Sequence, residues 1–199
     1  LKINKNKKKN PLINLNPNPF IFKREVETEL VSNLYKLNTI KLDDVDNEIL
    51  RYGNGRSSDY KLFENNSPII KYAAEDLISI MKQAVKSDIF IAESFFNIFQ
   101  TGSGIVPHNH IIQFDIDNGL INQKFSLVYY LSVGDQNSSE PGILKFQDPD
   151  EKILPNEGMI MIFPANRKHS TVYGGKTDRI MIGVNFYSII WFLIGLLYY

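Results

Sequence analysis

The sequence predicts a mainly β fold with flanking helices, an α+β domain in which a sandwich or small barrel carries two N-terminal helices on one face. Two segments with helical periodicity come first, and from Ile89 onward the chain changes to short β-rich runs separated by turn residues. A length of 199 residues is enough for one well-cored domain with extensions. We therefore expect a single core.

The composition excludes several classes of site and partner. Lysine plus arginine and aspartate plus glutamate number 22 each, so no net charge attracts the protein to nucleic acid or acidic membranes. There is no cysteine, which excludes disulfides, zinc–thiolate sites, iron–sulfur clusters and a thiol nucleophile. Any metal must therefore be bound by histidine, carboxylate or amide groups.

The two ends of the chain differ from its middle. Residues 1–18 are rich in lysine, asparagine and proline, which predicts a disordered basic arm, most simply a solvated tail. Without an apolar signal-peptide core in this arm, we expect a cytoplasmic protein, although a first residue other than methionine leaves open that the chain is a fragment. Residues 188–199 form an apolar tail. It is shorter than the roughly 20 residues of a membrane-spanning helix, so a membrane role is not expected, but a packed tail, a truncated anchor and a dimer contact remain open.

Two helices are expected before the β-rich region. Apolar residues recur at helical spacing within 25–37, which predicts the first helix. Ser67 and Pro68 have the residue types of an N-cap and a first helical position, and a wide apolar stripe follows as far as Ala84. Residues 38–66 between them are polar and contain turn signals such as Asn54-Gly55, so we expect loops there.

About seven strands are expected in the remainder of the chain. Each run is rich in β-branched or aromatic residues and is bounded by turn residues. In order the runs are "IFIAESFFNIF", "HNHIIQF", "KFSLVYYLSV", "GILKFQ", "GMIMIFP", "STVYG" and "RIMIGVNFYSI".

The three histidines are candidates for a metal site. On a strand, His108 and His110 would point to the same face, roughly 6.5–7 Å apart along the chain, close enough to share one ion. Imidazole is a good ligand for first-row transition metals. A pair of this kind is also common as ordinary polar residues on a strand. His169, where a strand resumes after a turn, adds a third imidazole in the same β-rich region.

Arg179 follows His169 by ten residues and begins the last strand. Alternation would place it on one face with Met181, Gly183 and Asn185, opposite an apolar face. An arginine inside a barrel is costly unless an anion meets it, and a carboxylate is its natural bidentate partner. The alternative is an arginine at the strand mouth, paired with Asp178 or with solvent.

Taken together, these motifs resemble the Fe(II)- and 2-oxoglutarate-dependent oxygenases, with a prolyl-hydroxylase-like barrel. The resemblance covers roughly residues 95–187 and is carried by "PHNH", "SLVYYLSV", "EPGILKFQDP", "LPNEGMIMIFP", "KHSTVYGG" and "RIMIGVNF". It implies a double-stranded β-helix, jelly-roll or cupin-like, over residues 19–187. It also implies an enzyme that hydroxylates a substrate while decarboxylating 2-oxoglutarate to succinate.

The same resemblance assigns the site. Fe(II) would be held by His108, His110 and His169, with no further catalytic side chain beyond the metal centre. The far carboxylate of 2-oxoglutarate would be bound by Arg179 and Tyr130, and Asn185 on the same strand face is included among the cofactor-binding residues.

One position departs from the common family pattern, which has Asp or Glu where this chain has His110. Three neutral imidazoles leave the charge of the ion uncompensated and should strengthen its attraction for anionic ligands. Asp115 is the second choice for a carboxylate ligand. Its odd offset from His110 would require a bulge or bend in the strand.

Other interpretations remain open. The segment from Pro164 to His169 also resembles a cupin box, so a cupin-type metal-binding protein is one alternative, and a non-catalytic sensor of metal or carboxylate is another. A third is an interaction module that binds no metal and contacts a partner through its basic arm. The substrate, a small molecule or a peptide, cannot be named from the sequence, nor can the oligomeric state. Loops 51–66 and 115–124 would form the rim that selects the substrate.

Overall fold

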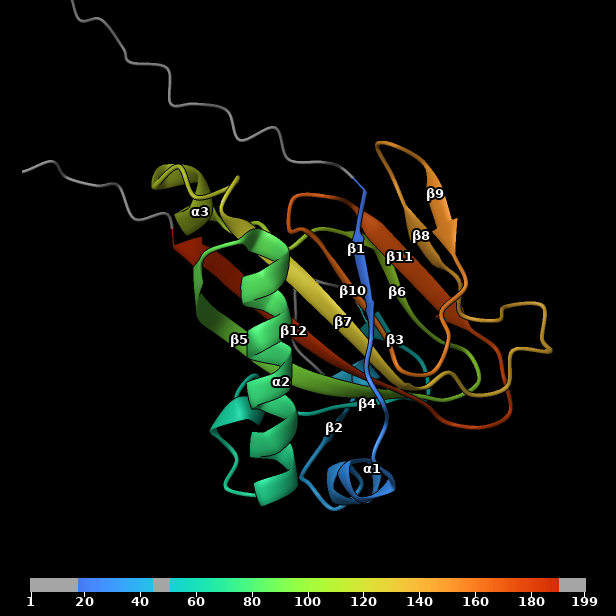
Figure 1. Ribbon diagram of the computed structural model, residues 1–199. Helices are drawn as coiled ribbons and strands as arrows, with labels where there is room; N and C mark the ends of the chain where they lie inside the picture. The colour runs from blue at the N-terminus through green and yellow to red at the C-terminus, as the bar shows by residue number, and fades with distance from the viewer. Residues whose placement is uncertain (1–17, 45–50, 190–199) are drawn as a thin grey trace, which may run out of the picture.

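The computed structural model describes residues 18–44 and 51–189, which form two antiparallel β-sheets with helices on one side (Figure 1). The larger sheet has seven strands, in the order β1 (Phe20–Lys23), β10 (Met159–Pro164), β7 (Lys124–Ser132), β12 (Arg179–Ile189), β5 (Asp88–Phe99), β4 (Arg56–Ser57) and β2 (Ile40–Lys41). The smaller sheet has five, in the order β3 (Arg51–Tyr52), β6 (Ser103–His108), β11 (His169–Tyr173), β8 (Leu144–Phe146) and β9 (Glu151–Ile153).

The outer face of the larger sheet is covered by helices. The 18-residue helix α2 (Pro68–Val85) lies across β5, β7 and β12, and the short α1 (Thr28–Leu34) packs beside it (Figure 1). Leu77 of α2 and Ile182 of β12 belong to one buried apolar cluster at this interface. Burial of each such side chain contributes about 1.5–3 kcal/mol, so this layer stabilises the sheet on which the interior residues are mounted.

The predicted alternation along the last strand is confirmed. Its apolar set packs against the helices, and its other set faces the space between the two sheets. The outward residues are Ile180, Ile182, Val184 and Phe186, and the inward residues include Met181, Gly183 and Asn185.

The second helix begins as predicted, with Ser67 as N-cap and Pro68 in the first turn. The Ser67 hydroxyl does not cap the helix; it donates to Asn33 Oδ1 at 3.3 Å and so connects the two helices. The first helix is shorter than predicted. Arg24 donates to the Glu25 carbonyl and to the Glu27 carboxylate, which holds the preceding residues extended.

The strand predicted from His108 to Phe114 is wrong beyond its first residue. β6 ends at His108, and a five-residue helix, α3 (Gln113–Asp117), follows. Side chains compete for the backbone here: Asn109 Oδ1 accepts from the Ile111 N–H, and Asp115 Oδ2 accepts from the Ile112 N–H. Both bonds favour turn and helix over strand.

Short strands were also missed. Residues 38–66, predicted as loops, contain β2, β3 and β4 together with the 3₁₀ turns η1 (Leu42–Asp44) and η2 (Leu62–Glu64). The two-residue strands are too brief to show a periodicity, and the neighbouring strands provide their hydrogen-bond partners.

The predicted basic arm and apolar tail lie outside the described residues, except that Asn18 is described and that Ser188 and Ile189 form the end of β12. Within the part of the chain that is described, none of the helices has the length and apolar character needed to cross a membrane.

Candidate metal centre

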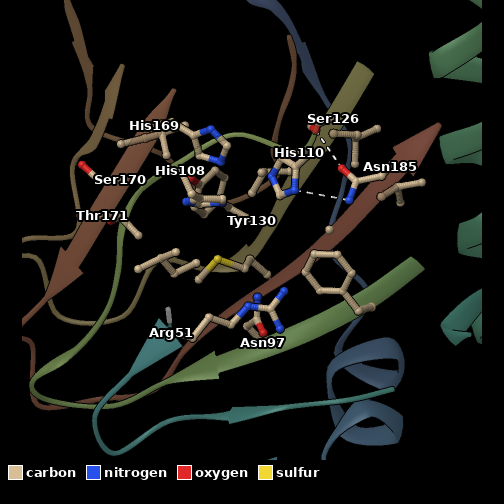
Figure 2. Close-up of a pocket in the computed structure, with 18 residues that line it drawn as sticks. Arg51, Asn97, His108, His110, Ser126, Tyr130, His169, Ser170, Thr171 and Asn185 are labelled. Atoms are coloured by element: carbon tan, nitrogen blue, oxygen red, sulfur yellow. Dashed lines mark hydrogen bonds between the residues drawn. The ribbon is translucent and has the colours of Figure 1, made fainter. Parts of the chain in front are cut away.

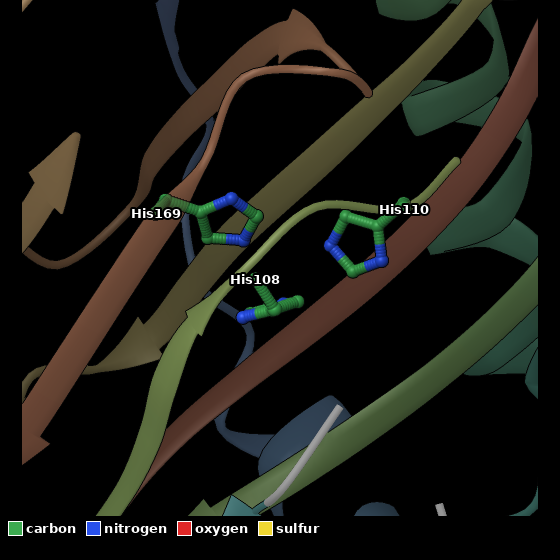
Figure 3. A group of neighbouring side chains, drawn as sticks. All are labelled: His108, His110 and His169. Atoms are coloured by element: carbon green, nitrogen blue, oxygen red, sulfur yellow. The ribbon is translucent and has the colours of Figure 1, made fainter. Parts of the chain in front are cut away.

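The three histidines converge at one end of the interior, where their rings point toward one another (Figure 3). His108 on β6 and His169 on β11 are direct cross-strand partners. His110 lies just beyond the end of β6, and its backbone N–H donates to the Ala165 carbonyl at 2.8 Å. One ring nitrogen from each residue lies within 4.8 Å of the others. The convergence of two separate chain segments predicted from sequence is therefore present.

Backbone carbonyls orient two of the three rings. Nδ1 of His108 lies 2.9 Å from the Val106 carbonyl, and Nδ1 of His169 lies 3.1 Å from the Arg167 carbonyl. A carbonyl can only accept, so Nδ1 carries the proton in both rings and Nε2 is free to bind an ion. Holding the rings in this tautomer prepares them as ligands.

The third ring has a different neighbour. Nδ1 of His110 lies 3.4 Å from Nδ2 of Asn185, a long contact. The amide of Asn185 is itself fixed, because Oδ1 accepts from the Ser126 hydroxyl at 2.7 Å and Nδ2 donates to the Glu93 carboxylate at 2.6 Å. The Glu93 carboxylate is thus linked to His110 through the Asn185 amide. His110 is the residue that stands where the common family pattern has Asp or Glu.

All three imidazoles are neutral at neutral pH. Burial is the largest cause lowering the pKa of each, and the pKa of His169 falls to about 3. The neighbouring histidine rings lower the pKa of His110 and His169 further. Neutral imidazoles, two of them with a free Nε2, fit a first-row transition metal ion, which needs unprotonated nitrogen ligands.

Asp115, the second choice for a ligand, lies on α3 and outside this group of three. Its carboxylate is fully used by other groups. Oδ2 accepts from the Ile112 N–H at 2.9 Å and from Lys124 Nζ at 2.7 Å, while Oδ1 accepts from the Tyr187 hydroxyl at 2.5 Å. The observed role of Asp115 is to attach α3 to the ends of β7 and β12.

A cavity of about 50 Å³ adjoins the histidines, between the two sheets (Figure 2). Tyr130 and Asn185, both predicted as cofactor-binding residues, line it. Burial raises the pKa of the Tyr130 phenol to about 12, so the hydroxyl keeps its proton and can donate. Met181 and Leu144 contribute apolar wall.

Arg179, at the start of β12, is fully buried. It lies two residues before Met181 on the same strand and does not line the cavity. Its Nη1 donates to the Gly142 carbonyl at 2.5 Å, and its guanidinium lies 5.2 Å from the ring centre of Tyr130. Nε and Nη2 have no hydrogen-bond partner. The alternative pairing with Asp178 is not observed, because that carboxylate accepts from Tyr35 and Gln100.

Gly142 makes room for this arginine. A Cβ added at Gly142 would lie 1.4 Å from Nη1 of Arg179, and the glycine φ of +78° is one that other residues rarely adopt. The backbone is therefore shaped around the guanidinium.

The sequence interpretation missed five polar residues that line the cavity: Arg51, Asn97, Ser126, Ser170 and Thr171. Strand alternation could have indicated Thr171, two positions after His169, and Ser126, four positions before Tyr130. Arg51 was not singled out, although it lies in segment 51–66, which was interpreted as a loop at the substrate rim.

The comparisons with known proteins agree with this architecture. No protein-family model and no curated protein matches the chain. A prolyl hydroxylase from Trichoplax adhaerens, solved with a hypoxia inducible factor peptide, superimposes with a TM-score of 0.63 at 15% identity, covering 87% of this chain and 84% of its own. A prolyl-4-hydroxylase from Pseudomonas putida gives 0.59 at 15% identity, with 88% and 95% covered.

A third similar structure is HygX from Streptomyces hygroscopicus, with nickel, 2-oxoglutarate and hygromycin B bound. It gives a TM-score of 0.66 at 12% identity, and the alignment covers 86% of this chain and 83% of HygX. At such identities the comparison shows the fold. The prediction of a double-stranded β-helix barrel with two helices packed on one face is confirmed.

Proposed function

We propose that this chain is an Fe(II)- and 2-oxoglutarate-dependent dioxygenase that hydroxylates a substrate not yet identified. The observation that carries the proposal is the convergence of three neutral imidazoles, two of them oriented by backbone carbonyls, inside a double-stranded β-helix. Solved structures of similar fold include enzymes of this class, one of them with 2-oxoglutarate and nickel bound. We also propose that the protein acts in the cytoplasm.

In this proposal His108, His110 and His169 hold the iron through one nitrogen each. When bound, ferrous iron with 2-oxoglutarate and dioxygen would supply the oxidation of the substrate and the decarboxylation of 2-oxoglutarate to succinate. The work of the chain is to orient the ligands, exclude water and position the substrate. Carbonyl bonds to His108 and His169 do the first of these.

Arg179 and Tyr130 would bind the far carboxylate of 2-oxoglutarate. A buried guanidinium with two unpartnered N–H groups is costly unless an anion meets it. The Tyr130 hydroxyl, protonated at neutral pH, would donate to the same carboxylate. Met181, a flexible side chain between the cavity and Arg179 along the strand, would have to move aside to admit it.

The three-histidine set has an electrostatic consequence. Without a carboxylate ligand, the double positive charge of the ion would be balanced by the co-substrate and by the more distant Glu93, which reaches His110 through Asn185. The site should therefore hold 2-oxoglutarate more strongly than a site with one anionic ligand would.

The proposal is tested by mixing the protein with Fe(II) and 2-oxoglutarate without oxygen and recording the visible metal-to-ligand absorption band. His169→Ala should abolish iron uptake, and Arg179→Ala should weaken the band. Arg56→Ala, which removes an arginine outside the cavity, should leave the band unchanged.

Admitting air then separates an enzyme from a sensor. An oxygenase should form succinate and consume oxygen, whereas a non-catalytic binding protein should keep iron and 2-oxoglutarate without either. Stoichiometric iron in His169→Ala would contradict the ligand assignment. The absence of both band and succinate in the wild type would contradict the proposed activity.

A further inference from the structure

Arg51 is a charged side chain that lines the cavity beside the histidines and takes no part in the proposed iron and 2-oxoglutarate sites. The residue is only 6% exposed. Its Nη1 donates to the Ser57 hydroxyl at 3.0 Å, and its guanidinium lies over the Phe95 ring at 4.8 Å. Nε has no partner, and among the described residues no aspartate or glutamate forms an ion pair with Arg51.

Two further buried polar atoms without partners line the same cavity. They are Oδ1 of Asn97 on β5 and Oγ1 of Thr171 on β11. In the view of Figure 2, Arg51 and Asn97 lie across the pocket from His108 and His169. Most buried polar groups are hydrogen-bonded, so three such atoms from three strands around one cavity indicate a polar ligand.

We propose that Arg51, Thr171 and Asn97 form a second carboxylate subsite, distinct from Arg179, which binds the acidic group of the substrate. The N–H of Arg51 and the hydroxyl of Thr171 would donate to the carboxylate oxygens. Oδ1 of Asn97 would accept from a hydroxyl or amino group next to that carboxylate. The substrate class is then a small hydroxy or amino acid.

The assignment to the substrate rests on the proposed function. In that proposal 2-oxoglutarate has one carboxylate end on the iron and the other on Arg179, so neither is left for Arg51. Arg51 also lines the same cavity as His108, His110 and His169, whereas Arg179 does not. A carboxylate on Arg51 would therefore lie close to the metal centre, where a substrate must lie.

The subsite itself can be tested on the full chain without iron. Glycolate, a small hydroxy acid, is titrated into ¹⁵N-labelled protein and followed by NMR, with acetamide as the uncharged comparison. Saturable shifts are expected at the amides of Arg51, Asn97 and Thr171. Arg51→Met and Thr171→Val should each weaken glycolate binding, the former by about tenfold or more because a charge-assisted hydrogen bond is lost.

Arg56→Met is the matched control, since Arg56 lies outside the cavity, and it should bind glycolate like the wild type. Arg51→Met removes the bond to Ser57 but leaves an apolar side chain against the Tyr60 and Phe95 rings, so that variant should fold, and its thermal unfolding verifies this. Equal glycolate affinity in wild type and Arg51→Met, or no saturable binding to the wild type, would overturn the subsite.

A second arm distinguishes substrate from co-substrate. In nickel-loaded protein, Arg51→Met should leave 2-oxoglutarate affinity within about twofold of the wild type, whereas Arg179→Met should weaken it by about tenfold or more. Glycolate should still bind with 2-oxoglutarate at saturation. If Arg51→Met loses 2-oxoglutarate as strongly as Arg179→Met does, the subsite serves the co-substrate and the substrate assignment is wrong. The metal-free titration keeps its meaning even if iron and 2-oxoglutarate do not bind.

Discussion

The layer between the larger sheet and the helices differs sharply from the space between the two sheets. The helix-covered layer is apolar, and its buried charge Arg24 has carboxylate partners in Glu27 and Asp76. In the described part of the chain, five buried side-chain polar atoms without a hydrogen-bond partner belong to interior residues: Arg51, Asn97, Thr171 and, with two atoms, Arg179. Adjacent residues of one strand thus stabilise the fold on one face and carry the groups proposed to bind ligands on the other.

The largest loss of stability is expected at the buried ion pair between Asp115 and Lys124. Asp115→Asn leaves Lys124, which is buried, without its carboxylate, and breaking a buried pair in this way costs about 3–5 kcal/mol. Urea unfolding measures the loss. The double variant Asp115→Asn with Lys124→Met should recover much of it; equal instability of single and double variants would mean that the pair itself is not the cause.

In the helix-covered layer, Leu77→Ala should lower the free energy of unfolding by about 3 kcal/mol, because Leu77 is fully buried and a cavity remains. Nickel and 2-oxoglutarate affinities, measured below the unfolding transition, should stay within about twofold of the wild type. A large loss of affinity would show that the two layers are not separable.

The interior should also be sensitive to acid. The folded pKa of His169, about 3, lies below the value of 6.5 that it has when unfolded. The unfolded chain therefore binds a proton first as the pH falls, and this residue lowers stability from about pH 6.5 toward pH 3 by up to ~1.4 kcal/mol per pH unit. Unfolding of metal-free protein at several pH values gives the slope. His169→Gln should reduce this slope of stability against pH. An unchanged slope would mean that other groups cause the acid sensitivity.

The smallest change in the free energy of unfolding is expected at Arg179, where a substitution should stabilise the protein. Arg179→Met removes a buried charge with two unpartnered N–H groups, at the cost of one bond to Gly142, so a gain of about 1 kcal/mol is expected. Arg24→Met, which breaks two ion pairs, should destabilise the protein. Chemical denaturation of both variants compares the layers directly, and a loss in Arg179→Met would show that this guanidinium stabilises the fold without a ligand.

Much of the helix-covered layer could be predicted from sequence, because long elements with clear periodicity determine it. The start of α2 at Pro68 and the two faces of β12 followed from residue pattern alone. Several elements of two to five residues, such as β3 and α3, could not be predicted. β3 is formed by pairing with β6, and α3 is formed by local side-chain bonds such as that of Asp115.

The candidate site could be predicted only in part. His108, His110 and His169 were identified by residue type and spacing, and the structure brings them together although His110 is not on a strand. Arg51 was missed because its importance depends on a fold in which a two-residue strand opposite Ile105 directs it into the cavity.

In the proposed site, the direct cross-strand pairing of His108 with His169 would couple the ion to a single sheet contact. Separation of β6 from β11 would remove two ligands at once, so release of the ion should follow local opening of this strand pair. Amide hydrogens in 103–108 and 169–173 should accordingly exchange with deuterium more slowly when the ion is present, to an extent set by its affinity. Those on α2 should change far less.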